Sequence, residues 1–195
     1  MLSQIFKDYN IVLGSNSPRR KQYMQDLQIP FTVRASDIDE TYPSTLQREA
    51  ITDFIANAKS QAIPLLAHNE IIITSDTTVW NNHTSLGKPV DRQEAYTMIK
   101  GMSGKQHEVI TSVCLRSKNK IKIFNCITKV DFIELSDEAI YFYIDTYKPY
   151  DKAGAYGIQE WIGLIGISKI DGSYTNIVGL PTTELVQELI AFIKE

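Results

Sequence analysis

Residues 11–20 have the sequence IVLGSNSPRR, which joins an apolar run to a short turn of small residues and then to a proline. This pattern predicts a buried strand that ends near Leu13 and a helix that begins at Pro18, because proline is favoured at the first helical position. Hydroxyl groups, backbone N–H groups and two guanidinium groups would then meet where the helix begins. One interpretation is a phosphate site, since helix N-termini and arginines both suit phosphate. The other is ordinary capping by serine, with two solvated arginines.

The composition is that of an ordinary globular protein. The 195 residues are 43% hydrophobic and 22% charged, which is enough for one domain over residues 1–195 without disulfides or a metal. The formal net charge of −3 argues against a general binder of nucleic acid or of membrane surfaces. Cys114 and Cys126 are expected to be buried thiols in a reducing compartment. Because there is no signal-peptide pattern and no apolar run of about 18 residues, the sequence predicts a cytoplasmic protein.

Alternating helical and extended patterns predict an α/β fold with a mixed central sheet flanked by helices. The capping-box pattern at residues 44–47 predicts that a second helix begins there and continues to about Ala62. The β-branched run at 71–74 predicts a central strand with residues 75–78 at its carboxyl end. We expect further strands at about 31–33, 107–115, 121–133, 161–169 and 174–178, and further helices at about 91–101, 136–147 and from Pro181 onward.

Asp76 is the first candidate for chemistry, because ligands of α/β sheets bind beyond the carboxyl ends of strands. A carboxylate at that place can act as a general base or hold a divalent metal. Alternatively, it only caps a turn with the two threonines that follow. Glu40 lies in an acidic loop, which is either solvated surface or close enough to share a metal with Asp76.

Other polar residues are weaker candidates when each is taken alone. Lys59 and Lys88 belong to a residue type that is mostly exposed, and the three histidines, His68, His83 and His107, lack the spacing of metal ligands and are expected to be structural or exposed. The loop at residues 151–159, DKAGAYGIQ, contains small residues that allow a backbone to approach a ligand closely. The amide of Gln159 can pair with a nucleobase edge. As a lone feature, the loop is best explained as a tight connection.

Taken together, the motifs resemble those of the Maf family of nucleoside triphosphate pyrophosphatases. The matching motifs occur in the family's order and span nearly the whole chain: SNSPRR at 15–20, AK at 58–59, DT at 76–77, KP at 88–89, HEVIT at 107–111, DKAGAYGIQ at 151–159 and GLP at 179–181. The resemblance implies a two-lobed α/β fold with a cleft, similar to that of inosine triphosphate pyrophosphatases, in a homodimer. It also implies hydrolysis of a nucleoside triphosphate between the α and β phosphates with a divalent metal, Mg²⁺ or Mn²⁺.

The resemblance also assigns roles to individual residues. Asp76 matches the family's proton-accepting aspartate, and Glu40 together with Asp76 matches its metal-binding positions. Its phosphate-binding positions correspond to Ser15, Arg19, Arg20, Lys59 and Lys88. The positions tied to base preference correspond to Arg19, Thr77 and Gln159, and this trio is similar to the branch that acts on dTTP and UTP, not to the 7-methyl-GTP branch. The chain departs from the family at Ser60 and Ser75, where alanine is common.

Three alternatives stay open on the sequence alone. The same fold and reaction with another nucleotide, such as a modified purine, is the first. A nucleotide-binding regulatory protein without useful turnover is the second, although the presence of Asp76, Glu40 and both lysines argues against it. A nucleic-acid binder that uses Arg19 and Arg20 is the third, and the negative net charge argues against it.

Overall fold

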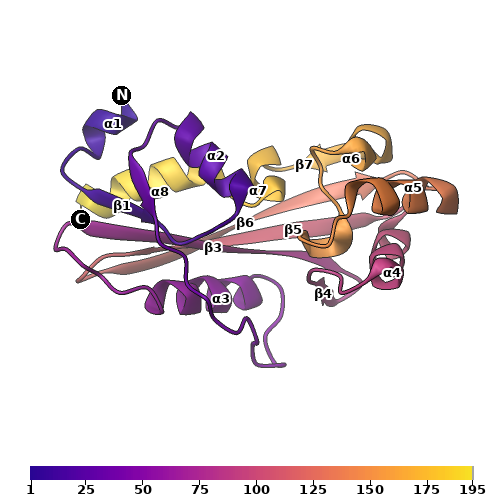
Figure 1. The fold of residues 1–195 in the computed structure, drawn as a ribbon, viewed down its shortest axis with the longest axis horizontal. Coiled ribbons are helices and arrows are strands. Elements are labelled where there is room, and N and C mark those ends of the chain that lie inside the picture. Colours follow the sequence, from indigo (N-terminus) through magenta and orange to yellow (C-terminus); the bar gives the residue numbers. More distant parts are fainter. Residues whose placement is uncertain (195) are drawn as a thin grey trace. The chain divides into compact units, whose positions relative to one another are not determined.

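The computed structural model describes residues 1–194, which contain a mixed seven-stranded sheet flanked by helices (Figure 1). Six strands are hydrogen-bonded in the order β2-β1-β3-β5-β6-β7, and β4 pairs with β3. β1 is parallel to β2 and β3, whereas β4 is antiparallel to β3 and β7 is antiparallel to β6. The predicted α/β class with a mixed sheet is therefore confirmed. The strands are β1 (Asn10–Leu13), β2 (Phe31–Val33), β3 (Glu70–Asn81), β4 (Thr84–Leu86), β5 (Gln106–Arg116), β6 (Ile121–Phe132) and β7 (Ile167–Asp171).

The chain separates into two compact units. Unit 1 comprises Met1–Asp76, Thr111–Cys126 and the described residues from Gly179 onward, and unit 2 comprises Thr77–Ile110 and Ile127–Val178. That residues 1–195 form a single domain therefore stays a prediction. The helices of unit 1 are α1 (Leu2–Ile5), α2 (Pro18–Asp26), α3 (Glu49–Gln61) and α8 (Thr182–Lys194), and those of unit 2 are α4 (Arg92–Met102), α5 (Asp137–Tyr147), α6 (Trp161–Gly166) and α7 (Tyr174–Val178), with a 3₁₀ turn η1 (Ala153–Ala155).

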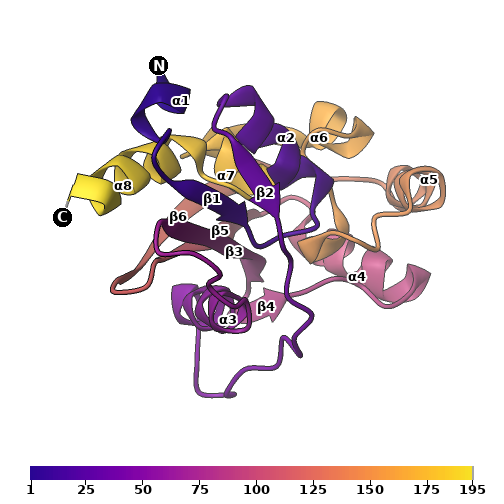
Figure 2. The same cartoon turned by 60° about the vertical axis from the view of Figure 1, so that its left-hand side comes forward.

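In unit 1 the alternation of side chains along the strands builds a core on each face of the sheet. Leu13 and Ile73 belong to the cluster that contains Met24 of α2 and Leu185 of α8, whereas Val12 belongs to a separate cluster. Figure 2 shows α3 on one side of these strands and α2 and α8 on the other. The apolar run at 11–13 is thus buried on both faces, as is expected of a strand between two parallel neighbours.

Several helix boundaries agree with the sequence. Side-chain oxygens of Ser17, Asp91 and Ser136 accept hydrogen bonds from the first turns of α2, α4 and α5, which confirms these three predicted starts. The predicted C-terminal helix is confirmed as α8. Within residues 1–194, every helix is too short or too polar to span a membrane.

Two predicted boundaries near the candidate site are wrong. α3 begins at Glu49 and not at the capping-box pattern, because Arg48 has a φ of 53°, which would interrupt a helix begun earlier. β3 continues to Asn81, so Asp76 lies within a strand and not at its carboxyl end. The strand that does end here is β1, whose pairing with β3 stops at Leu13 and Ile73.

Two predicted strands of unit 2 are largely helical. Residues 161–166 form α6, and β7 begins only at Ile167. Residues 174–178 form α7, whose first turn is capped because Ser173 Oγ accepts a hydrogen bond from the Asn176 N–H group at 3.3 Å. Short apolar runs fit a helix or a strand equally well, which explains both errors. The short elements α1 and β4 were not predicted.

His107 of β5 is a buried residue of unit 2, which agrees with one of its two predicted interpretations. Its side chain lies with Phe132 and Tyr156 in edge-on ring contacts, and its Nε2 atom is 2.8 Å from the Tyr156 hydroxyl. Burial lowers the pKa of His107 to about 4, and Asp131 only partly opposes this. The imidazole is therefore neutral in the folded protein at neutral pH.

We predict that His107 makes the stability of the protein depend on pH. The unfolded chain binds a proton at this residue below about pH 6.5, whereas the folded chain does not until about pH 4, so stability is lost as the pH falls between these values. Between pH 7 and pH 4.5 the loss from this residue is about 2 to 3 kcal/mol. Urea unfolding of the wild type and of His107→Gln across this range measures it. The two proteins should differ in slope, and parallel pH profiles would contradict the prediction.

Candidate active site

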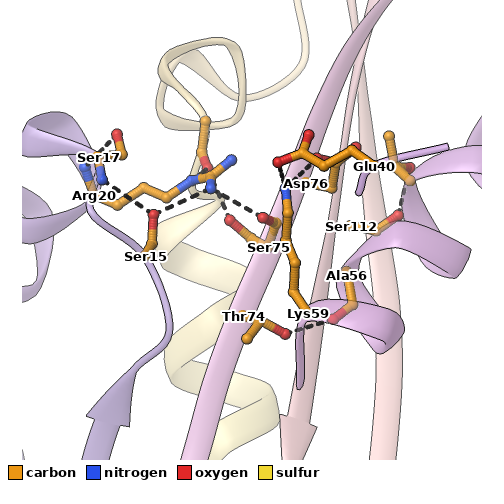
Figure 3. Close-up of polar contacts among 12 residues, drawn as sticks. Ser15, Ser17, Arg20, Glu40, Ala56, Lys59, Thr74, Ser75, Asp76 and Ser112 are labelled. Atoms are coloured by element: carbon orange, nitrogen blue, oxygen red, sulfur yellow. Dashed lines mark hydrogen bonds and ion pairs between the residues drawn. The ribbon is translucent and has the colours of Figure 1, made fainter. Parts of the chain in front are cut away.

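A lysine and two carboxylates from three separate segments of unit 1 form the centre of the candidate site (Figure 3). Lys59 Nζ is 2.7 Å from Asp76 Oδ1 and 3.0 Å from Glu40 Oε1. Lys59 lies near the end of α3, Asp76 in β3, and Glu40 in the loop between β2 and α3. The side chains of Lys59 and Asp76 are 13% and 10% exposed, whereas that of Glu40 is 47% exposed. The site is therefore buried at its base and open at Glu40.

The packing of α3 on β3 explains why Lys59 reaches Asp76. Thr74 Oγ1 of β3 donates a 2.6 Å hydrogen bond to the Ala56 carbonyl oxygen of α3, and both residues are buried. Lys59 follows Ala56 by three residues, so it lies on the same side of the helix. Asp76 follows Thr74 by two residues and therefore has its side chain on the same face of the strand. One buried contact thus brings the two charged groups together.

Burial raises the pKa of the Asp76 carboxyl above its usual value. Lys59 and Arg20 favour the charged form, and Glu40 disfavours it. A carboxylate whose pKa is raised by burial binds a proton more tightly than an exposed carboxylate. The electrostatics of Asp76 therefore suit a general base.

Arg20 donates a hydrogen bond to β3 just beyond the point where the pairing of β1 with β3 ends. The last backbone bond between the two strands runs from Gly14 N to Ile73 O, at 2.7 Å. Two residues later, the Ser75 carbonyl oxygen accepts a 2.9 Å hydrogen bond from Arg20 Nη1 instead. The same guanidinium group donates through Nε to the Gly179 carbonyl oxygen at 2.9 Å, and through Nη1 to Ser15 Oγ at 3.3 Å. Arg20 therefore joins α2, β3 and the segment before α8, next to Asp76.

The two departures from the expected alanines both have partners in unit 1. Ser75 Oγ donates a 3.4 Å hydrogen bond to the Gly179 carbonyl oxygen, which Arg20 also contacts. Ser60 Oγ accepts a 2.9 Å hydrogen bond from Arg116 Nε, and the Ser60 carbonyl oxygen accepts one from Arg116 Nη2 at 2.6 Å. These contacts explain how serine is accommodated beside Lys59 and Asp76.

Sequence reasoning did not identify one buried hydroxyl pair of unit 1. Thr52 Oγ1 of α3 and Ser112 Oγ of β5 are 2.6 Å apart, and Ser112 Oγ donates to Asp53 Oδ1 at 2.6 Å. Both hydroxyl-bearing residues are fully buried. They link α3 to β5 and so help to hold the helix that carries Lys59. The signal in the sequence is Ser112, a polar residue at a position in the predicted strand where an apolar residue is expected.

The remaining predicted residues are found in both units. Arg19 lies beside Arg20 in the first turn of α2 and is half-buried. Thr77 continues β3, Lys88 is exposed between β4 and α4, and Gln159 is exposed in the loop before α6. The structure thus brings Ser15, Arg20, Glu40, Lys59 and Asp76 together within unit 1. For Thr77, Lys88 and Gln159, which belong to unit 2, a role in the site stays a prediction.

Glu40 and Asp76 could supply two of the ligands of the expected divalent metal, but not a complete set. No cluster of three or more His, Cys, Asp or Glu side chains suited to a metal ion is found within residues 1–194. However, both carboxylates contact the same ammonium group, so their oxygens already converge on one cationic position. Magnesium commonly takes one or two protein carboxylates and completes its shell with water and substrate phosphates. The two carboxylates fit that pattern.

Comparisons with known proteins agree with the motifs. The family model described as "Maf-like protein" matches residues 10–192. A "dTTP/UTP pyrophosphatase" from Flavobacterium psychrophilum is 52% identical over 191 residues, which cover 97% of this chain and 98% of the relative. A protein of the same name from Flavobacterium johnsoniae is 48% identical over 194 residues, which cover 99% of this chain and 100% of the relative.

One solved structure supports the fold alone. A HAM1 protein from Coxiella burnetii superimposes with a TM-score of 0.50 over 95% of this chain and 98% of that chain, at 13% sequence identity. At this identity the likeness concerns the arrangement of strands and helices and not the chemistry of the site.

We predict that Arg20→Lys lowers the free energy of unfolding by about 2 kcal/mol. A lysine ammonium group cannot reach the Gly179 and Ser75 carbonyl oxygens and Ser15 Oγ together, so polar groups next to Asp76 lose their partner. Urea unfolding monitored by circular dichroism measures the loss. Ser15→Ala removes only one of these bonds and should cost less. An Arg20→Lys protein as stable as the wild type would contradict this account of Arg20.

Proposed function

The chain belongs to the Maf family, and from this premise we propose that it is a pyrophosphatase that converts dTTP and UTP to the monophosphate and pyrophosphate. The observation that carries the proposal is the Lys59 ammonium group between the carboxylates of Asp76 and Glu40. Relatives named dTTP/UTP pyrophosphatase, about half identical over nearly the full length, support the choice of substrates.

The reaction we propose is attack by water on the α-phosphorus. The water oxygen forms a bond to phosphorus, and the bond from phosphorus to the oxygen that bridges the α and β phosphates breaks. One proton of the water passes to the Asp76 carboxylate, and pyrophosphate leaves with the bridging oxygen. Burial raises the pKa of Asp76, which supports this role as proton acceptor.

Cationic groups stabilise the charge on the departing pyrophosphate in this proposal. Arg19, Arg20, Lys59 and Lys88 are the candidates, and Ser15 with backbone N–H groups at the start of α2 adds uncharged donors. Phosphoryl transfer depends mainly on such positioning and electrostatic stabilisation. Arg19, Arg20 and Lys59 lie in unit 1 with Asp76, and Lys88 lies in unit 2.

Glu40 and Asp76 would hold the divalent cation, Mg²⁺ or Mn²⁺, that we propose as cofactor. Such a cation supplies Lewis-acid stabilisation of phosphate oxygens and lowers the pKa of a bound water. Lys59 contacts both carboxylates in the structure, and its ammonium group would be available to a phosphate oxygen when a metal cation binds those carboxylates.

Base preference would come from Arg19, Thr77 and Gln159. A pyrimidine such as uracil or thymine offers an acceptor at O4 and a donor at N3, and an amide side chain can pair with both. A site that pairs with such an edge rejects bases that leave its polar groups unmatched. The same reaction on a modified purine nucleotide, and nucleotide binding without turnover, are the alternatives that the experiment below separates.

We also propose that the protein acts in the cytoplasm as a homodimer. Cys114 is buried as predicted, whereas Cys126 is only partly buried, and neither forms a disulfide within residues 1–194, which is in keeping with a reducing compartment. The dimer rests on the family resemblance, and the exposed apolar residues Phe142 and Leu164 of unit 2 are in keeping with a covered surface.

The proposed function is tested with a panel of nucleoside triphosphates and either Mg²⁺ or Mn²⁺, followed by chromatography of the products. We expect dTTP and UTP to give monophosphate and pyrophosphate.

Asp76→Asn is the matched control for the nucleotide panel, and this variant should bind nucleotide but lose turnover by at least about a thousandfold. Diphosphate with orthophosphate would mean cleavage at another bond, preferred cleavage of a purine nucleotide would favour the first alternative, and no cleavage would favour the second.

Arg19→Ala tests the phosphate site separately from turnover. We expect it to weaken binding of UTP on the order of tenfold to a hundredfold and binding of UMP much less, because an arginine contact to the β or γ phosphate exists only in the triphosphate. Titration calorimetry in the Asp76→Asn background prevents turnover during the measurement. Equal losses for both ligands would argue against a phosphate contact by Arg19.

A further inference from the structure

Ser15, between β1 and α2, has a buried hydroxyl group that accepts two hydrogen bonds. The residue is only 8% exposed. Its Oγ atom accepts one bond from the Ser17 N–H group at 3.2 Å and one from Arg20 Nη1 at 3.3 Å (Figure 3). A serine hydroxyl can accept two hydrogen bonds and donate one. Both acceptor positions of Ser15 are therefore filled, and its hydroxyl can only donate.

The hydroxyl hydrogen of Ser15 is left without an acceptor. Within residues 1–194, the hydrogen bonds of Oγ are the two that it accepts, and no acceptor for its own hydrogen is found. Buried polar groups in folded proteins are normally paired. The hydroxyl also lies at the start of α2, a helix of nine residues whose N-terminus has a partial positive charge. Both observations point to a ligand with negatively charged oxygens that accept hydrogen bonds.

Arg20, in contrast, uses its donors on the protein itself. Nε donates to the Gly179 carbonyl oxygen, and Nη1 donates to the Ser75 carbonyl oxygen and to Ser15 Oγ. Because Nη1 has two N–H groups, these two bonds engage both of them. A guanidinium group binds phosphate bidentately either through Nε and one Nη nitrogen or through both Nη nitrogens. Each of these modes requires a donor that Arg20 has already engaged.

The segment before α8 fixes the orientation of the Arg20 guanidinium group. Gly179 has a φ of 115°, a conformation that other residues rarely adopt. Its carbonyl oxygen accepts from Arg20 Nε at 2.9 Å and from Ser75 Oγ at 3.4 Å. Gly179 belongs to the GLP motif at 179–181, which the proposed reaction does not otherwise use. This motif therefore holds Nε at one end of the group while Nη1 reaches Ser15 at the other.

We propose that Arg20 is a positioning residue and not a phosphate ligand: with the Ser17 N–H group, it orients the Ser15 hydroxyl as a donor to a phosphate oxygen of the substrate. This inference rests on the proposed function and deepens it, because it gives the two adjacent arginines different roles. Arg19 contacts phosphate directly, whereas Arg20 acts through Ser15. The positive charge of Arg20 next to Oγ also polarises the O–H bond and strengthens it as a donor.

A double-mutant cycle tests this role through the binding of UTP. Dissociation constants are measured by titration calorimetry with Mg²⁺ in the Asp76→Asn background, which prevents turnover. Ser15→Ala removes the donor and should weaken UTP binding about tenfold. Arg20→Lys keeps the positive charge but cannot hold all three acceptors, so it should cause a loss of about the same size. In the Ser15→Ala background, Arg20→Lys should weaken binding further by less than about twofold.

Arg19→Lys is the matched control, because it makes the same change at the neighbouring position of α2. As a direct phosphate contact, Arg19 should contribute independently of Ser15, so Arg19→Lys should weaken UTP binding by the same factor in both backgrounds. If Arg20→Lys also causes equal losses in both backgrounds, Arg20 does not act through Ser15 and the proposal is overturned. An Arg20→Lys protein that binds UTP as tightly as the Asp76→Asn parent would overturn it as well.

Ser15→Cys gives a second route if Arg20→Lys does not fold. A thiol can still accept hydrogen bonds but is a weak donor. If the Ser15 hydroxyl acts as a donor, Ser15→Cys should therefore weaken UTP binding nearly as much as Ser15→Ala does. UTP binding by Ser15→Cys as tight as that of the parent protein would overturn the proposal.

The outcomes distinguish this inference from the proposed function. Conversion of UTP to UMP and pyrophosphate by the wild type, together with independent effects of Ser15→Ala and Arg20→Lys, would overturn the positioning role alone. A wild-type protein that neither binds nor cleaves dTTP and UTP would overturn the proposed function, and the positioning role with it.

Discussion

The candidate site depends on one ammonium group, Lys59 Nζ, which is bonded to carboxylates from two other segments. Asp76 lies in a buried strand, and a charged group left there without its partner costs about 3 to 5 kcal/mol. Lys59 can offset that cost only because α3 is fixed against β3 by the buried contact between Thr74 and Ala56. The position of one helix against one strand is therefore what makes a charged Asp76 compatible with burial.

The short length of β1 is the second feature on which the candidate site depends. Its pairing with β3 stops at Ile73, so the Ser75 carbonyl oxygen has no partner from β1. A buried carbonyl group must be paired, and Arg20 supplies the donor that β1 would otherwise supply. Because the donor is a guanidinium group and not a backbone amide, the sheet carries a positive charge at the point where β1 ends. That charge lies close enough to Asp76 to favour its ionised form.

Features that depend on neighbouring residues were predicted correctly more often than features that depend on distant parts of the chain. The strand, turn and helix at residues 11–20 depend on neighbouring residues, so their prediction is confirmed. Asp76 was identified, but its place at a strand end was wrong, because a run of apolar residues marks where a strand is buried and not where it stops. The segment at 174–178 is helical although its residues favour strands, because Ser173 caps it and the Asn176 side-chain amide donates to the Val109 carbonyl oxygen. The contact of Lys59 with both carboxylates joins residues far apart in sequence, so only the family resemblance linked them beforehand.

The contacts around Asp76 and the contacts around Gln159 form two separate sets. Lys59, Asp76 and Arg20 are held by bonds among residues of unit 1, whereas the segment around Gln159 is held by Tyr143 and His107 of unit 2. A substitution that alters that segment therefore leaves the bonds around Asp76 intact, and the reverse also holds.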